Sequence, residues 1–473
     1  MMRREAPLRS LMAVMGFFRV MAPFNLAPPP FGPLAVITRR KRPRRRKVSW
    51  SDAAMEPVLP FVLRRSPKRR TPSRHHSNQY RSRLPVRIPA PIAYIVLYVV
   101  LYAAFGAASP FWPKFFETRT LVSQQIGLVL AAAMLTRLVS GPLVAMLADL
   151  FGSLRLVLAG CAALAALAAV ALIWAEIFWL LLLVALVQAA ALAPTTSIAD
   201  ALSVNTARPR LAGRRFEYGW IRGSASAAFV LGTLIAGQLI SPADVSPVVW
   251  LNAAFLIAAA GATALVPSVA SRAASRSEPT FLVPEMKALL QISRFRALII
   301  ASALVYGSHA VHDAFAVIRW SDAGLSTLAI SFLWSEAVVA EVLVFMLAGP
   351  ALLDRFGVRG AAVLAAAAGI VRWSVAGVTT SVLLLSLIQP LHGLTFALLH
   401  LACMRMMGTL VPTSVAATAQ ALYAFSSGLV TAALTFLAGV LYGSYAGATF
   451  LPMAAICVIA LPFVWFGFTD RRD

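Results

Sequence analysis

Long apolar stretches recur from Pro91 to the end of the chain, and they constrain this sequence more than any other feature. An α-helix needs about 20 apolar residues to cross the ~30 Å hydrocarbon core of a bilayer. The composition agrees, because 60% of the 473 residues are hydrophobic, whereas a soluble domain is about half apolar. We therefore predict an all-α membrane protein with twelve transmembrane helices. The predicted spans are 91–113, 122–147, 154–174, 177–199, 217–240, 247–266, 295–319, 327–349, 358–378, 381–404, 415–440 and 446–468.

Positive charge in the predicted loops alternates between the two sides of the membrane. Cationic loops are retained on the cytoplasmic side. With the N-terminus placed in the cytoplasm, that side receives Arg155, Arg208, Arg210, Arg214, Arg215, Arg272, Arg276, Lys287, Arg294, Arg296, Arg355, Arg359, Arg405, Arg471 and Arg472. The opposite side receives only Lys114, Arg119 and Arg319. This asymmetry supports the number of spans and predicts that both termini lie in the cytoplasm. The expected location of this multi-pass protein is a bacterial-type inner (plasma) membrane.

Residues 1–90 differ sharply from the rest of the chain. They hold 21 of the 42 Lys and Arg residues and 3 of the 18 Asp and Glu residues, so they supply +18 of the net charge of +24. A segment rich in Pro and Arg without apolar periodicity cannot bury enough surface to fold, so we predict a disordered tail. A basic arm for nucleic acid, a patch for anionic lipid and a targeting peptide around 11–18 are open interpretations. Another is upstream sequence from a misassigned start, with Met55 as a later candidate. We favour a dispensable tail and expect no nucleic-acid partner.

An internal repeat divides the apolar region into two six-helix halves, residues 91–266 and 295–473, joined by a polar cytoplasmic linker at 267–294. Each half carries a similar turn after its second span. The matching positions are Gly141-Pro142 with Gly349-Pro350, and Asp149-x-Phe151-Gly152 with Asp354-x-Phe356-Gly357. Repeated halves around a site at the membrane midplane are typical of secondary transporters.

The repeated turn resembles the loop signature of the major facilitator superfamily, and the resemblance covers residues 91–468. In that superfamily the turn braces and gates the cytoplasmic face. The resemblance implies gating roles for Gly141, Asp149, Gly152, Arg155, Asp354, Arg355, Gly357 and Arg359. The first copy departs from the usual pattern, since Leu150 stands where a basic residue is common.

Further stretches are similar to the phenylpropionate-permease group, which is related to the lactose and nucleoside proton symporters. They are "FGAASPFWPKFF" (105–116), "YGWIRGSASAAF" (218–229), "GSHAVHDAF" (307–315), "LWSEAVVAEVLVF" (333–345), "VRWSVAG" (371–377), "QPLHGLTFALLH" (389–400) and "AQALY" (419–423). The resemblance implies a proton-linked importer of a small organic acid. Ala225 and His312 depart from the group's pattern, which bears on the substrate more than on the fold.

Ionisable side chains inside the predicted spans gather in the second half. A charged group near the bilayer centre normally faces a partner or a water-filled cavity. His309 and Asp313 are four residues apart and share one helix face, while His392 and His400 are separated by about 80° of rotation. Because a carboxylate tunes a nearby imidazole, we predict that His309, Asp313, His392 and Glu341 couple transport to protons. Helix–helix hydrogen bonding is the alternative role for each histidine.

Other polar and aromatic residues in the spans are candidates for solute binding. The predicted substrate-binding residues are Arg222, Gln389, Phe396, His400, Phe105 and Tyr423. Arg222 has an alternative role as a partner of Asp200. Arg372 is predicted to form a buried charge pair with Glu336, with Glu341 as the other possible partner.

The motifs of common enzymes are absent from the sequence, which has no P-loop, H-E-x-x-H or G-x-S-x-G pattern. Cys161, Cys403 and Cys457 lack metal-ligand spacing, so we expect no enzyme activity, metal or cofactor. Without a nucleotide motif, transport is driven by a gradient. We predict a monomeric proton symporter that imports a small molecule, with an aromatic or other monocarboxylate as the best candidate. A sugar or nucleoside symporter, a proton-antiporting efflux pump and a non-transporting receptor or scaffold are the alternatives.

Overall fold

The computed structural model describes residues 89–205, 210–211, 214–215, 218–241, 244–267 and 282–468. The predictions made for residues 1–88 and for the linker up to residue 281 lie outside these residues. Apart from two short strands, β1 (Arg210–Leu211) and β2 (Arg214–Arg215), which pair in antiparallel fashion, the regular structure described is helical.

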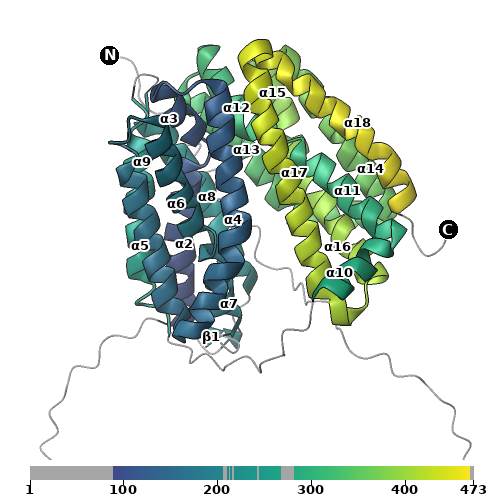
Figure 1. Ribbon diagram of the computed structural model, residues 1–473, viewed down its shortest axis with the longest axis horizontal. Helices are drawn as coiled ribbons and strands as arrows, with labels where there is room; N and C mark the ends of the chain where they lie inside the picture. Colours follow the sequence, from purple (N-terminus) through teal and green to yellow (C-terminus); the bar gives the residue numbers. More distant parts are fainter. Residues whose placement is uncertain are drawn as a thin grey trace, which may run out of the picture. The chain divides into compact units, whose positions relative to one another are not determined.

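The helices of the N-terminal half follow the predicted spans with two differences (Figure 1). A short helix, α3, follows the break after Ala108, and the fourth span is divided between α6 and α7. The elements are α2 (Ala90–Ala108), α3 (Trp112–Thr118), α4 (Ser123–Phe151), α5 (Leu154–Ala171), α6 (Phe178–Leu192), α7 (Thr195–Asn205), α8 (Tyr218–Leu239) and α9 (Pro247–Ala262).

The helices of the C-terminal half are more often interrupted. The first of them, α10, lies within the stretch predicted as a linker. The elements are α10 (Leu282–Gln291), α11 (Ser293–Gly307), α12 (Ala310–Asp322), α13 (Thr327–Leu343), η1 (Val344–Ala348), α14 (Gly349–Val378), α15 (Val382–Ile388), η2 (Gln389–Leu391), η3 (Gly393–Leu398), α16 (Leu399–Leu410), η4 (Thr413–Val415), α17 (Ala416–Tyr445), η5 (Ala446–Thr449) and α18 (Phe450–Gly467).

The tenth predicted span is not one regular helix. Pro390 has no N–H to continue the hydrogen-bond ladder, and α15 ends at Ile388 before a 3₁₀ turn, η2, and a π-helical turn, η3. These turns change the rotation along the segment, so the predicted angle between His392 and His400 does not apply. Such π-helical turns are frequent at functional sites.

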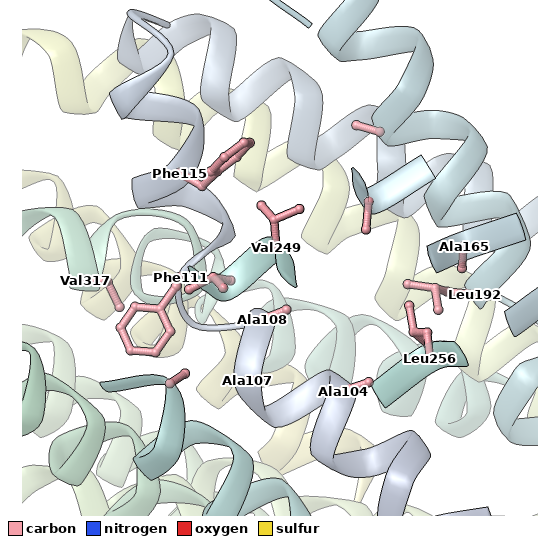
Figure 2. Packing of buried hydrophobic residues seen from close by; sticks show 14 of the residues in the cluster. Ala104, Ala107, Ala108, Phe111, Phe115, Ala165, Leu192, Val249, Leu256 and Val317 are labelled. Carbon is pink, nitrogen blue, oxygen red and sulfur yellow. The ribbon is translucent and has the colours of Figure 1, made fainter. Parts of the chain in front are cut away.

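Small residues allow close helix crossings in the N-terminal half. A Cβ atom added at Gly106 of α2 would lie 1.9 Å from the Phe229 carbonyl oxygen, and one at Gly232 of α8 would lie 2.5 Å from the Ala103 oxygen. Small residues of this kind let helix backbones approach in a membrane. Figure 2 shows the neighbouring core, where Ala104 of α2 lies beside Leu256 of α9 and Ala108 lies beside Val249.

The two halves contact each other through two helix pairs, α4 with α17 and α8 with α13. A smaller contact joins α3 to α12, where Phe111 lies beside Val317 (Figure 2). Within the described residues, nine helical segments are long and apolar enough to cross a membrane. The predicted all-α membrane class is therefore confirmed.

Candidate functional site

Each of the two repeated turns contains a glycine with a positive φ angle, and Gly357 interrupts α14 at this point. Gly152 and Gly357 have φ angles of +64° and +66°, a left-handed conformation that costs a residue with a Cβ atom about 1–2 kcal/mol. In each half an arginine after the turn donates to a carbonyl oxygen just beyond the end of the last helix. The N–H groups of Arg155 and Arg359 donate to Val266 and Phe468, respectively, each at 2.9 Å.

The other predicted gating residues have less uniform surroundings. Asp354 accepts a 2.6 Å hydrogen bond from Arg405 of α16, and Arg355 lies over the ring of Phe356. A Cβ atom added at Gly141 would lie 3.8 Å from that of Ala193, which is an ordinary contact distance. Asp149 is the predicted equivalent of Asp354 in the first turn, and its side chain lies outside the part of the chain that the structure describes.

A buried guanidinium, that of Arg372 in α14, is the centre of the polar contacts in the C-terminal half. The residue is 0% exposed. It donates to Nδ1 of His392 at 3.0 Å, to Oε1 of Gln389 at 2.9 Å and to Nε2 of His312 at 3.5 Å. It also stacks 4.5 Å from the Trp373 ring. Burying an unpaired charge costs several kcal/mol, and these contacts offset part of that cost.

The imidazoles of His312 and His392 each bond to Arg372 through one nitrogen and contact a carboxylate through the other. Nδ1 of His312 lies 3.0 Å from Oδ1 of Asp313, and Nε2 of His392 lies 3.5 Å from Oε2 of Glu341. The acids are less buried than the imidazoles, since the Asp313 side chain is 44% exposed and that of Glu341 is 27% exposed. The cluster therefore runs from one accessible carboxylate to another through Arg372.

His309 lies in this cluster, but its imidazole does not contact Asp313 as predicted. The break between α11 and α12 places its Nδ1 against the carbonyl oxygens of Val305 and Tyr306, at 3.1 and 3.2 Å. Its Nε2 lies 2.9 Å from the Thr395 hydroxyl. The ring centroid is 5.2 Å from that of His392. His312, which follows three residues later, takes the predicted position beside Asp313.

The predicted Glu336–Arg372 charge pair is wrong. Arg372 bonds to His312, Gln389 and His392 instead, while Glu336 interacts with Ser386 of α15. One carboxylate oxygen of Glu336 and the Nε of Arg372 are buried without a hydrogen-bond partner among the described residues. Spacing along two helices predicts that opposite charges can meet, but it does not rank a carboxylate against nearer neutral acceptors.

Aromatic side chains adjoin the cluster. Phe396 stacks on His392 with a centroid distance of 5.6 Å, and the ring of Tyr306 meets that of Phe396 edge-on. The Tyr306 and Tyr423 hydroxyls are 2.9 Å apart, and Nδ1 of His400 lies 3.3 Å from the Tyr423 hydroxyl. The predicted residues Phe396, His400 and Tyr423 are therefore brought together, with Tyr306 as an addition.

The N-terminal half contributes a smaller group around Arg222 of α8. The guanidinium donates to the Tyr102 hydroxyl at 2.7 Å and lies 3.7 Å from Asp200. Phe105 packs edge-on against Tyr102. Arg222 and His400 both interact electrostatically with Glu341, so this group lies within electrostatic range of the Glu341 end of the cluster in the other half.

Comparison with known proteins identifies the family of the chain. The model of the MFS_1-like family matches residues 92–452. The chain belongs to this family. This MFS_1-like chain is 30% identical over 365 residues to a probable 3-phenylpropionic acid transporter of Escherichia coli (strain K12), covering 76% of this chain and 93% of that protein. The predicted resemblance to the superfamily and to the phenylpropionate group is thereby confirmed.

Solved structures of transporters have the same fold as the MFS_1-like chain. The nucleoside transporter NupG matches with a TM-score of 0.71 and 18% identity, covering 81% of this chain and 100% of that one. A D-xylose–proton symporter matches with a TM-score of 0.59 and 15% identity, covering 80% and 97%. The family and these relatives are transporters, which agrees with the prediction that the chain is not an enzyme.

Several members of the polar groups were not predicted from the sequence. Tyr98 donates a 2.5 Å hydrogen bond to Asp200, Tyr102 binds Arg222, and Thr395 binds His309. Hydroxyl-bearing residues are common in apolar helices, so composition alone does not single these out. His312 carried a signal in the sequence, because a histidine at this position departs from the pattern of the similar group.

Proposed function

We propose that this MFS_1-like protein is a proton-coupled symporter that imports a small aromatic or other monocarboxylate, such as a phenylpropionate-like acid. The observation that carries the proposal is the Arg372 cluster, with Asp313 and Glu341 at its two ends. Ionisable groups in membrane helices are costly and mark substrate or proton pathways. Two partly accessible carboxylates beside imidazoles are suited to take up and release a proton.

The solute site proposed here lies between the Arg222 group and the aromatic residues near the cluster. A guanidinium binds a carboxylate strongly through charge-assisted hydrogen bonds. Phe105 on one side and Phe396 and Tyr423 on the other offer rings against which an aromatic solute can pack. Gln389 is 1% exposed and bonded to Arg372, so we assign it to the cluster rather than to the solute. The 30% identity to the probable phenylpropionic acid transporter supports the same solute class.

Twelve membrane spans remain our proposal for the topology. Of the nine candidate segments in the described residues, 327–378 and 413–467 contain 52 and 55 residues, each long enough for two crossings. Division of these two gives eleven, and the shorter apolar helix Pro247–Ala262 gives the twelfth. In this topology both termini and the Gly152 and Gly357 turns lie in the cytoplasm. The turns then latch that side during alternating access.

Uptake into liposomes tests the proposal directly. The full chain is reconstituted, an acidic outside solution is imposed, and accumulation of radiolabelled 3-phenylpropionate is followed. We expect accumulation above the outside concentration, which a protonophore abolishes; empty liposomes are the control. Accumulation only under the opposite gradient would indicate efflux by antiport. Uptake of xylose or a nucleoside instead of aromatic acids would refute the solute class, and the absence of all solute flux would favour a receptor or scaffold.

A further inference from the structure

The hydrogen-bond roles around Arg372 are fixed by its chemistry. A guanidinium has five N–H donors and no acceptor, and it stays charged in proteins. Any ring nitrogen bonded to it must therefore be an unprotonated acceptor. This applies to Nδ1 of His392, 3.0 Å from Nη1, and to Nε2 of His312, 3.5 Å from Nη2.

The side-chain amide of Gln389 also requires Nε2 of His312 to be an acceptor. Because Arg372 can only donate, the amide atom 2.9 Å from its Nη2 is the oxygen Oε1. The amide nitrogen of Gln389 is then the atom that lies 3.4 Å from Nε2 of His312. Two donors converge on this one ring nitrogen, which leaves no place for a proton on it.

The proton of each neutral ring must then lie on the other nitrogen, and both of these nitrogens point at carboxylates. His312 carries its proton on Nδ1 and donates to Asp313 at 3.0 Å, whereas His392 carries it on Nε2 and directs it toward Glu341 at 3.5 Å. The two rings are thus opposite tautomers, related through one guanidinium.

Packing limits rotation of the His312 ring away from this arrangement. The ring stacks on Trp334 with a centroid distance of 5.0 Å and an interplanar angle of 22°. It also meets Trp320 and Trp373 at centroid distances of 5.8 Å. A flipped ring would turn a carbon toward both Asp313 and Arg372, so Asp313 would lose this donor and Arg372 would lose one of its three acceptors.

We propose that His312 and His392 are positioning residues, which Arg372 holds as neutral imidazoles of opposite tautomer, and that Asp313 and Glu341 carry the exchanged proton. This inference rests on the proposed proton-coupled function. A proton added to either ring would have to displace Arg372 and would place a second cation beside it. A proton added to one acid instead brings the cluster of one cation and two carboxylates to neutrality.

The other charged and titratable groups near the two acids agree with this assignment. Asp313 interacts electrostatically with His309, His392 and Arg372. Glu341 interacts in the same way with Arg222 and His400. The Nδ1 of His309 faces two carbonyl oxygens, so this nitrogen is also a donor, and the Thr395 hydroxyl can complete the neutral ring by donating to Nε2. All three clustered imidazoles can therefore stay uncharged while the acids exchange protons.

Nitrogen NMR on the full chain in liposomes, with ¹⁵N-labelled histidine, tests the tautomers without any solute. We expect one Nδ1–H and one Nε2–H neutral ring, assigned by the signals missing from His312→Asn and His392→Gln, with neither becoming an imidazolium between pH 5 and 8. The appearance of imidazolium shifts for either ring in this range, or the same tautomer for both, would overturn the proposal.

A crossed set of amide substitutions tests the positioning role in transport. An asparagine amide reaches the place of Nδ1 and a glutamine amide that of Nε2. His312→Asn and His392→Gln therefore keep the donor to the acid, whereas His312→Gln and His392→Asn lose it. We expect proton-driven accumulation of 3-phenylpropionate to fall about tenfold more with the second pair, and its pH profile to shift.

The outcomes separate this inference from the proposed function. Equal losses in all four variants, or the same amide preferred at both positions, contradict the positioning role. Absence of proton-driven flux in the wild-type chain contradicts the proposed function, and the NMR result then still decides the tautomers. Solute exchange without a gradient, together with a monodisperse profile in detergent, shows which variants are folded.

Discussion

The two halves of the molecule share a scaffold but differ in where they place charge. Arg155 and Arg359 close equivalent turns through matching bonds to Val266 and Phe468. The charged group of the N-terminal half, around Arg222, is 47% exposed at that side chain, whereas Arg372 of the C-terminal half is fully buried. Duplication of a fold therefore preserves the turns that hold helix ends together, while the buried charge belongs to one half.

Interruptions of the helices explain much of this difference. In the C-terminal half, the break between α11 and α12 turns the carbonyl oxygens of Val305 and Tyr306 toward His309. The turns η2 and η3 bring Gln389 and His392 to Arg372. A buried polar contact in the N-terminal half joins the neutral side chains of Gln188 and Asn252, at 3.1 Å. In this protein the buried ionisable side chains thus lie beside interruptions of the helical backbone.

Replacement of the central arginine of each half should give the largest contrast. Arg372→Met takes a charged donor away from three acceptors at once, and we expect a loss of about 3–5 kcal/mol in stability and of all proton-driven uptake. Arg222→Met removes a partly exposed pair, for which about 0–1 kcal/mol is typical, but it should weaken solute binding. Thermal unfolding in detergent and uptake assays measure both effects.

Arg372→Lys sharpens the same comparison. It keeps the charge but lacks the planar fork that reaches three acceptors, so it should recover part of the stability and little of the transport. Similar stability losses for the two methionine variants would show that burial does not distinguish the halves.

Replacement of one carboxylate in each half should give the next largest effect. Asp313→Asn removes a proton carrier, so we expect proton-driven accumulation to be abolished while exchange of solute across the membrane continues. Asp200→Asn alters the group that holds Arg222 and should raise the solute concentration for half-maximal uptake, with accumulation retained. Parallel measurements of accumulation and exchange separate the two. If Asp313→Asn loses both activities equally, or neither, it is not a coupling residue.

The sequence predicts the scaffold better than the contacts of the site. Span length, loop charge and the repeated Phe-Gly turns depend on local sequence, so the membrane class and the family follow from them. The partners of Arg372 depend on breaks at Ser308 and Pro390 that re-aim side chains between helices. Spacing alone placed His309 beside Asp313 and Glu336 beside Arg372; the first contact is made by His312 instead, and the second does not form.

Substitution of the turn glycines should show where the halves are alike. Gly152→Ala and Gly357→Ala force a Cβ atom into a left-handed conformation, so each should destabilise the protein by about 1–2 kcal/mol. Gly160 lies inside α5 with no neighbour within 4 Å of an added Cβ atom. Gly160→Ala is therefore a matched control that should be neutral or stabilise by about 0.5–1 kcal/mol. A large effect at only one turn would argue against equivalent roles.

The smallest expected effect concerns an ion pair that joins the halves at the end opposite the two turns. Lys114 of α3 lies 3.1 Å from Asp322, the last residue of α12, and 2.5 Å from Glu117 within its own half. The Asp322 side chain is 57% exposed, and such pairs contribute about 0.2–1 kcal/mol.

Asp322→Asn should therefore increase the population opened at this end by a few-fold at most, and high salt should reduce the difference from wild type. Spin labels at Val122→Cys and Ala323→Cys report the distance between the halves, and Glu117→Gln is the control, since it removes a carboxylate that does not join them. An unchanged distance distribution in Asp322→Asn, or an equal change in Glu117→Gln, would mean that apolar packing of Phe111 against Val317 closes this end without help from charge.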